Sequence, residues 1–134
     1  MEANIKKILE NAKTIAVIGA SRDLNKDSYK VIKYLHESGY QILPINSKTD
    51  NNFFYGNKYH KKLNEIKVKI DILNIFRPSS EILEITKQIL NTNIQTLWLQ
   101  LGIFNSESKN VLKNKKINFI QNKCIKIEHQ KLFN

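Results

Sequence analysis

Three small residues, Gly19-Ala20-Ser21, are the ones whose types and position point most directly to a chemistry. They follow a continuous apolar run from Thr14 to Ile18 and precede a segment with helical periodicity. The chain must therefore turn there from a strand into a helix. In an open parallel sheet such a turn lies at the carboxyl edge, where ligands bind. The unpaired N–H groups of the next helix's first turn favour an anion, so the sequence predicts a phosphate-bearing ligand.

The same turn departs from the fingerprint of NAD-binding proteins. The pattern G-x-G-x-x-G needs three glycines, and here Gly19 stands alone, with Ser21 at the second glycine position. The second predicted strand ends in Asn46, where an NAD enzyme usually presents Asp or Glu to the ribose. Asn46 followed by Lys48 suits a ribose that carries an additional phosphate. The alternatives are an ordinary tight turn for Gly19 and a solvated loop position for Lys48.

The elements that must position this turn alternate between helix and strand. Gly39 supplies the left-handed residue that ends the second helix. The predicted strands are 14–18, 40–45, 70–76, 96–101 and 117–120, and the predicted helices are 5–12, 28–38, a segment after Pro78 through Ile89, and 106–114. Residues 47–62 are predicted as a long loop, with a short helical turn in it as an alternative, and Ser79 or Ser80 as the cap of the third helix. This alternation predicts an α/β fold with a parallel sheet covered on both faces.

Length and composition indicate one domain over residues 1–134 with one core. No apolar run approaches the ~20 residues of a membrane span, and the polar N-terminus is unlike a signal peptide. Cys124 is the only cysteine, which excludes an intrachain disulfide. We therefore expect a cytoplasmic protein.

The net charge of +10 comes from scattered lysines. Such a strong preference for lysine over arginine is typical of an A/T-rich coding sequence. Nucleic-acid binding would favour arginine, clustered charge and interleaved aromatic residues. We therefore do not expect a nucleic-acid partner, although a basic field would help to collect a polyanionic small molecule.

The sequence shows no combination of nucleophile, base and orienting group. His36 is expected on a helix flank and His60 in a loop. Glu128 and His129 are adjacent, so on a helix they would point about 100° apart. No spacing typical of metal ligands is present. We expect no catalytic residue and no metal site, and whether the protein is an enzyme stays open.

Six motifs then extend over nearly the whole chain: IAVIGAS at 15–21, SYKVIKYLHESGYQILPIN at 28–46, YGNKYHKKLNEI at 55–66, DILNIFRPSSEI at 71–82, LWLQLGI at 97–103 and NKCIKIEH at 122–129. With these motifs the chain resembles the small single-domain CoA-binding proteins, whose fold matches the CoA-binding domain of succinyl-CoA synthetase. The resemblance implies a Rossmann-like, three-layer α/β fold with a five-stranded, mainly parallel sheet. It also implies coenzyme A as the ligand and a helical tail from Cys124 onward.

The resemblance further implies which residues would contact coenzyme A. They are Gly19, Ala20 and Ser21 at the pyrophosphate, Lys26 and Ser28 beside it, Asn46 and Lys48 at the ribose and its 3′-phosphate, Phe76, Arg77 and Pro78 on the adenine side, and Gln100 and Gly102 along the pantetheine path. Arg22 joins this set because the two arginines of the chain, Arg22 and Arg77, both flank the implied site. An ion pair at a strand end is the alternative role for Arg77. The chain departs from the family pattern at Ser47, where proline is usual.

The function expected from these features is binding of coenzyme A or an acyl-CoA, as a binding, sensor or carrier module. The alternative is an enzyme, or a non-catalytic component of one, in acyl-CoA metabolism. A NAD(P)-dependent oxidoreductase is a third reading, weakened by the missing glycines. The expected partner is the small molecule, with no membrane, and self-association stays open. Cys124 is either an inert packed thiol or a thiol that forms a mixed disulfide with coenzyme A.

Overall fold

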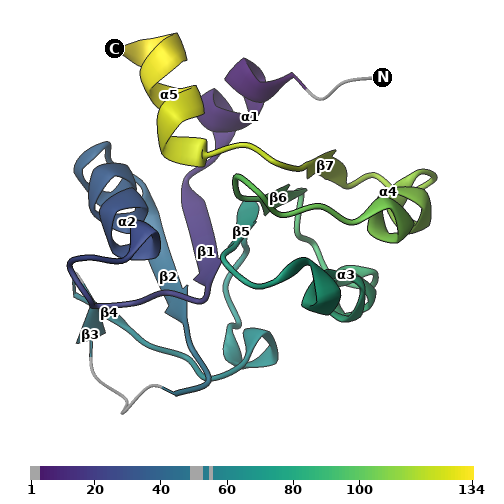
Figure 1. The fold of residues 1–134 in the computed structure, drawn as a ribbon, viewed down its shortest axis with the longest axis horizontal. Helices are drawn as coiled ribbons and strands as arrows, with labels where there is room; N and C mark the ends of the chain where they lie inside the picture. The colour runs from purple at the N-terminus through teal and green to yellow at the C-terminus, as the bar shows by residue number, and fades with distance from the viewer. Residues whose placement is uncertain (1–3, 49–52, 55) are drawn as a thin grey trace.

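A five-stranded sheet, parallel throughout, forms the middle layer of the molecule (Figure 1). Its strand order is β2-β1-β5-β6-β7. The strands are β1 Thr14–Ile18, β2 Gln41–Ile45, β5 Ile72–Ile75, β6 Thr96–Leu99 and β7 Asn118–Ile120. The helices are α1 Ile5–Asn11, α2 Asp27–Glu37, α3 Ile82–Ile89, α4 Ser106–Leu112 and α5 Ile125–Phe133. The structure is a computed structural model that describes residues 4–48, 53–54 and 56–134.

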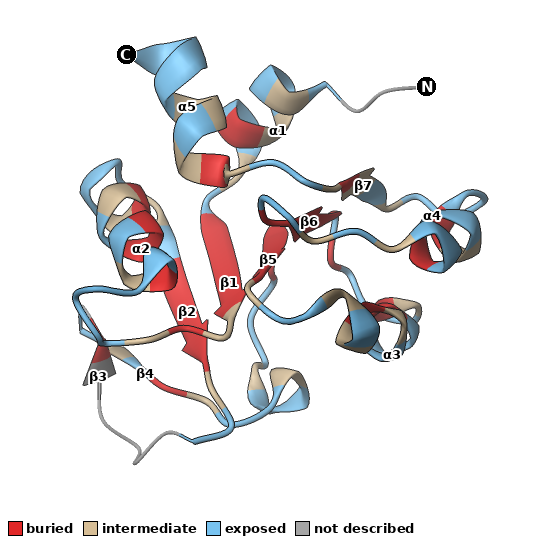
Figure 2. Ribbon diagram, viewed as in Figure 1, coloured by how far each residue is buried: buried red, intermediate tan, exposed pale blue. Residues whose placement is uncertain are grey.

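Helices cover both faces of this sheet, which confirms the predicted Rossmann-like, three-layer α/β fold. Successive side chains of a strand point to opposite faces. Val17 and Trp98 therefore join the core under α1, α2 and α5, which we call the α2 face. Ala16 and Leu97 join the core under α3 and α4, the α3 face. Figure 2 shows the central strands as the most buried part of the chain.

The sheet has a topological switch point between β1 and β5. These two strands are neighbours, although β2 and the segment up to residue 71 lie between them in the chain. From β1 the chain passes over the α2 face to β2, whereas from β5 it passes over the α3 face to β6. The connections after the two strands therefore diverge, and this divergence opens a crevice at the carboxyl edge.

The two halves of the α3 face are covered unequally. Helices α3 and α4 pack over β5, β6 and β7. Over β1 and β2 the cover is η1, a single 3₁₀ turn at Leu63–Glu65, and the chain that follows it. Leu63 and Ile66 are only partly buried there. A short turn covers less surface than a helix, so this half of the face stays open.

Two local predictions were wrong. The described part of the segment 47–62 contains strands: β3 (Phe53–Phe54) and β4 (Asn57–Lys58) pair antiparallel, and His60 forms a bridge to β2. Residues 49–52 and 55 of this prediction lie outside the described residues. Ser79 and Ser80 do not cap α3 but form a second 3₁₀ turn, η2 (Ser79–Glu81). The Ser79 hydroxyl accepts a hydrogen bond from Phe104 N (3.0 Å), which ties this turn to the loop after β6.

The tail is helical, as the resemblance implied: Cys124 is the N-cap of α5. The helices in the described part of the chain are all too short or too polar to cross a membrane.

Candidate ligand-binding site

The turn after β1 packs the backbone of Gly19 directly against the backbone of Phe76. Gly19 has φ +86°, and a Cβ at this position would lie 2.5 Å from the carbonyl oxygen of Phe76. Phe76 N donates to Ile18 O (2.9 Å), so β5 follows β1 up to this point. Gly19 N donates to Ile45 O (2.9 Å), which fixes the turn against β2. Only glycine fits both the positive φ and the close approach.

Beyond Gly19, hydrogen bonds tie the turn to the start of α2. Ser21 N donates to the buried hydroxyl of Ser28 (3.2 Å), and the Ser21 hydroxyl accepts from Asp23 N (3.1 Å). Lys26 is the N-cap of α2, and no side chain caps that end. The first-turn N–H groups of α2 therefore lie next to the turn, as the sequence predicted for an anion site.

The side chain of Asn46 joins the loops that follow β1 and β2. Its amide nitrogen donates to Ala20 O (2.8 Å), and its amide oxygen accepts from Lys48 N (2.9 Å). Asn46 N also donates to His60 O (2.9 Å). Asn46 thus holds the two loops in register. An aspartate here could not make the amide donation, which is a structural reason for the absence of the acidic residue.

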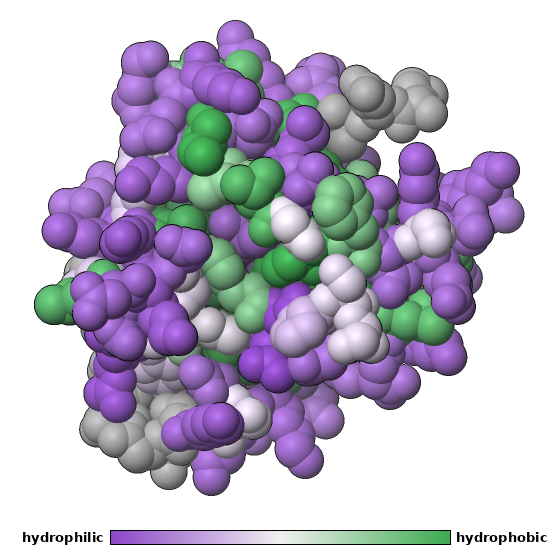
Figure 3. Space-filling view, in the orientation of Figure 1, coloured by the Kyte–Doolittle hydropathy of each residue, from purple (hydrophilic) through white to green (hydrophobic). Residues whose placement is uncertain are grey.

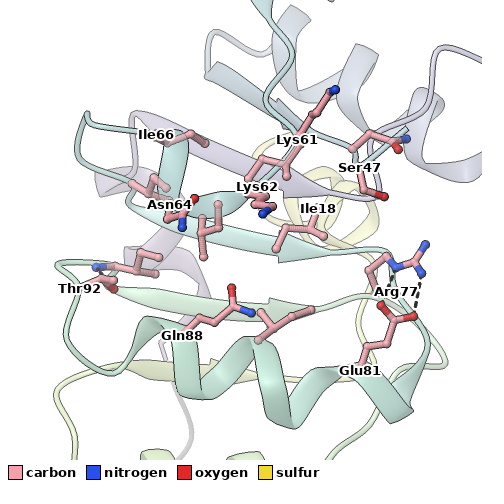
Figure 4. Close-up of a pocket in the computed structure, with 17 residues that line it drawn as sticks. Ile18, Ser47, Lys61, Lys62, Asn64, Ile66, Arg77, Glu81, Gln88 and Thr92 are labelled. Atoms are coloured by element: carbon pink, nitrogen blue, oxygen red, sulfur yellow. Dashed lines mark hydrogen bonds and ion pairs between the residues drawn. The ribbon is translucent and has the colours of Figure 1, made fainter. Parts of the chain in front are cut away.

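A cleft of about 860 Å³ opens beside these turns on the α3 face, between η1 and α3 (Figure 4). Its apolar lining consists of Ile18, Ile45, Leu63, Ile66, Ile70, Ile85 and Ile94. Its polar lining includes Asn46, Ser47, Lys61, Lys62, Asn64, Arg77, Glu81, Gln88 and Thr92. Small-molecule sites usually have volumes of about 300–1,000 Å³ and combine an apolar lining with a few polar groups. The cleft has both properties.

The cations of the cleft differ in their partners. The Arg77 guanidinium binds both carboxylate oxygens of Glu81, with Nη2–Oε2 at 2.7 Å and Nε–Oε1 at 3.1 Å. This hydrogen bonding raises the pKa of Arg77, and the two side chains stay 45% and 44% exposed. The alternative role of Arg77 as an ion pair is therefore present in the structure. The ammonium of Lys62 forms no hydrogen bond or ion pair with any described residue.

On the other side of the switch point, the end of β6 is bound to the start of α5. The buried Gln100 accepts a hydrogen bond from Ile125 N (2.9 Å) through its amide oxygen. Trp98 Nε1 donates to Lys123 O (2.8 Å), and Gly102 N donates to Asn122 Oδ1 (2.8 Å). The amide oxygen of Gln100 is therefore already hydrogen-bonded to the first turn of α5.

Apolar side chains are exposed next to this region. Leu101 and Phe104, on either side of Gly102, are 64% and 51% exposed. Figure 3 shows hydrophobic side chains gathered near the centre of an otherwise hydrophilic face, between α2, α5 and the segment after β6. The carboxyl edge thus combines polar turns with accessible apolar surface.

The structure brings some of the predicted residues together and leaves others at the margin. Gly19, Asn46 and Arg77 line the cleft, whereas Ala20 and Ser28 are buried behind the turn. The remaining predicted residues do not line the cleft: Ser21, Arg22, Lys26, Lys48, Phe76, Pro78, Gln100 and Gly102. Arg22 packs its guanidinium over the Tyr59 ring, 5.6 Å from the centroid.

Sequence reasoning missed the wall of the cleft formed by Lys61, Lys62 and Asn64. It also missed two polar residues on the opposite side, Gln88 in α3 and Thr92 in the turn after α3. The only sequence signal was the motif YGNKYHKKLNEI, in which two adjacent lysines precede the short 3₁₀ turn. Their position depends on how this segment packs beside β2, and local periodicity does not predict it.

The histidines lie apart from the cleft lining. Tyr34 Oη is 2.7 Å from His129 Nδ1 and accepts a hydrogen bond from Asn134 Nδ2 (2.7 Å). The His129 ring also lies edge-on to Tyr40, which precedes β2 at the amino edge of the sheet. Burial lowers the pKa of His129, so the neutral ring, which can accept the Tyr34 proton, is favoured. Within the described residues no three His, Cys, Asp or Glu side chains are grouped to hold a metal ion.

Comparison with known proteins identifies the family of this chain. The model of the CoA binding domain matches residues 13–130. The chain belongs to the CoA-binding domain family. This agrees with the resemblance drawn from the sequence motifs.

Other members and neighbours of the family extend the comparison. The protein YneT of Bacillus subtilis (strain 168), described as uncharacterized, is 37% identical over 128 residues, which are 96% of this chain and 93% of YneT. The structure of the cell-free protein ID.343 from Thermus thermophilus has a TM-score of 0.91 and 34% identity, covering 98% of this chain and all of that one. A dinucleotide-forming acetyl-coenzyme A synthetase from Ca. Korarchaeum cryptofilum has a TM-score of 0.71 and 23% identity over 87% of this chain and 27% of its own. That last likeness shows the fold alone.

Proposed function

We propose that this protein binds coenzyme A or an acyl-CoA at the carboxyl edge of the sheet and acts as a binding, sensor or carrier module. One observation carries the proposal. Gly19, whose backbone packs against Phe76 at the switch point, stands at the mouth of a large, partly cationic cleft in a member of the CoA-binding domain family. An open α/β sheet binds its ligands at this position.

The diphosphate of the ligand would lie against Gly19-Ala20-Ser21 and the first turn of α2. The helix end favours negative charge there, but Asp27 in the same turn opposes it. The positive charges of Arg22 and Lys26 in the loop before α2 would offset Asp27 and also Asp23 of the same loop. We therefore expect the diphosphate contact to weaken as ionic strength rises.

The two ends of coenzyme A would leave this turn in opposite directions. The adenosine end would enter the cleft beside Asn46 and Arg77, where apolar side chains can contact a purine. The pantetheine arm would pass Gln100 and Gly102, where apolar side chains are exposed. Since the chain has Asn46 where NAD enzymes carry an acidic residue, NAD would lose its ribose contact.

Titration calorimetry of the purified protein tests the proposal. Coenzyme A should bind in the micromolar range, about −8 kcal/mol, and NAD should bind at least tenfold more weakly. Mass spectrometry of small molecules that co-purify with freshly expressed protein would identify the bound acyl group. Equal or tighter binding of NAD would contradict the assignment.

A pair of variants tests whether coenzyme A binds in the cleft or elsewhere on the surface. Ser47 lines the cleft, and Ser47→Trp would place a large ring at its mouth. Ser38 is an exposed residue at the C-terminal end of α2, so Ser38→Trp is the matched control. Ser47→Trp should weaken coenzyme A binding at least tenfold, whereas Ser38→Trp should bind like the wild type. Equal binding by both variants would place the ligand elsewhere.

A turnover assay distinguishes a binding module from an enzyme. The pure protein, incubated with acetyl-CoA or succinyl-CoA, should release no free thiol above the rate without protein. Sustained hydrolysis that is lost in His129→Ala would show an enzyme instead.

A further inference from the structure

Lys62 is a cation of the cleft that no carboxylate of a described residue pairs with. Figure 4 shows its ammonium over the floor of the cleft near Ile18, whereas the side chain of Lys61 extends away from the cleft. The guanidinium of Arg77 is held by both oxygens of Glu81, so that pair adds little net charge. Among the described residues that line the cleft, Lys62 is therefore the cation best placed to receive an anion.

The surroundings of Lys62 suit a purine as well as a phosphate. Ile18 and Ile66 offer apolar contact for the flat ring, and the amides of Asn64 and Gln88 line the cleft from η1 and from α3 (Figure 4). Carboxamides can both donate and accept, as the edge of an adenine requires. An apolar floor, amides from two walls and an ammonium without a partner among the described residues fit an adenosine with a phosphate on its ribose.

Lys48 is less well placed for the same role. It is exposed and does not line the cleft, although its backbone N–H binds Asn46 Oδ1. The cleft lining on this side ends at its neighbour Ser47. Lys62 directly precedes η1, and its side chain extends from that wall of the cleft toward Ile18 (Figure 4).

We propose that Lys62, rather than Lys48, binds the 3′-phosphate of coenzyme A, and that the cleft thereby selects adenosine that is phosphorylated at the 3′ position. The inference rests on the proposed function, because it assigns one end of the same ligand. A lysine ammonium and a phosphate form a charge-assisted hydrogen bond, which is stronger than a neutral one. Because Lys62 is exposed, it loses little solvation when it binds.

The test compares coenzyme A with dephospho-CoA by calorimetry in the wild type and in Lys62→Ala. The wild type should bind coenzyme A about tenfold more tightly than dephospho-CoA. Lys62→Ala should reduce this ratio to about one by weakening coenzyme A alone, and Lys62→Arg should keep most of it. Lys33→Ala, which removes an exposed lysine of α2, controls for net charge and should keep the full ratio.

Adenosine 3′,5′-bisphosphate, which has no pantetheine arm, tests whether Lys62 contacts the adenosine end of the ligand. Its binding should also weaken about tenfold in Lys62→Ala. If instead it binds both proteins equally while coenzyme A does not, Lys62 contacts another part of coenzyme A and the inference is wrong.

Three further results would overturn the inference while the proposed function stands. The first is equal binding of coenzyme A and dephospho-CoA by the wild type. The second is equal weakening of both ligands in Lys62→Ala, which would place Lys62 at the diphosphate. The third is loss of the ratio in Lys48→Ala or Lys61→Ala while Lys62→Ala keeps it. Failure of the wild type to bind either ligand would overturn the proposed function itself.

Discussion

The α2 face of the sheet is closed, whereas the β1–β2 half of the α3 face is open. On the α2 face three helices pack over Ile15, Ile72 and Trp98, which are completely buried. Over β1 and β2 on the α3 face, a single 3₁₀ turn leaves a cleft of about 860 Å³. Alternate residues of the same strands supply both surfaces. The length of the covering element therefore decides whether this part of the sheet becomes core or lines a cleft.

Polar contacts strengthen this contrast. The closed face is joined to its helices by buried hydrogen bonds, such as Gln100 to Ile125 N and Trp98 to Lys123 O. The polar groups of the cleft are mostly exposed, and Lys62 has no described partner. Buried polar contacts are expensive to break, whereas exposed ones cost little. We therefore expect stability to depend on the closed face and ligand binding on the open half.

Replacement of Trp98 should have the largest effect on stability. Trp98 is fully buried, and its indole N–H is bonded to Lys123 O. Trp98→Ala should lower the free energy of unfolding by about 3–5 kcal/mol, because it leaves a cavity and an unpaired carbonyl. Urea denaturation measures the loss. A loss below about 1 kcal/mol would show that the α2 face is not the stabilising half.

Gln100 should come next. Gln100→Ala removes the acceptor of the buried Ile125 N–H and should destabilise by about 1–3 kcal/mol. Hydrogen exchange should increase first at the start of α5. Gln95→Ala, at an exposed position just before β6, is the control and should change stability by less than about 0.5 kcal/mol. Similar values for the two variants would contradict a stabilising role of the bond to α5.

Two isoleucines compare the closed face and the open half directly. Ile66 lines the cleft and is partly exposed, whereas Ile72 is fully buried on the α2 face. Ile66→Ala should cost about 1 kcal/mol or less, and Ile72→Ala about 2–5 kcal/mol. Equal losses in urea denaturation would mean that the cleft is closed in solution.

The ion pair between Arg77 and Glu81 should contribute little to stability. Both side chains are nearly half exposed, at 45% and 44%. A double-mutant cycle with Arg77→Ala and Glu81→Ala should give a coupling energy of about 0.5 kcal/mol. The coupling should fall further at high salt. A coupling above about 2 kcal/mol would make the pair a structural element of the fold.

His129 should cause the smallest effect, which depends on pH. Because burial lowers its folded-state pKa below the unfolded value of about 6.5, the unfolded chain binds the proton more readily. The stability from the neutral ring is therefore present above about pH 6.5 and is lost as the pH falls through the folded-state pKa. Urea midpoints at pH 7.5 and 5.5 should differ less in His129→Gln than in the wild type. An equal difference would show that His129 does not contribute.

Several parts of the fold could be predicted because their causes are local. The continuous apolar run predicted β1 with its observed ends, Thr14 and Ile18. Gly39, with φ +101°, ends α2 as predicted. The prediction that Ser79 caps α3 was wrong because the Ser79 hydroxyl accepts a hydrogen bond from Phe104 N, 25 residues away. The hairpin of β3 and β4 was missed because Phe54 packs on a residue far away in the sequence: the Tyr29 and Phe54 rings lie 5.5 Å apart.

The sequence by itself determined the alternation of strands and helices, the glycine turn at the end of β1 and the family motifs. Each of these depends on backbone sterics or on residues close together in the chain. Only the tertiary structure decided that one half of the α3 face stays open, that Gln100 is bound to α5, and that Lys62 stands over Ile18 while Lys48 lies outside the cleft. These features depend on contacts between segments far apart in the sequence, which local sequence patterns do not predict.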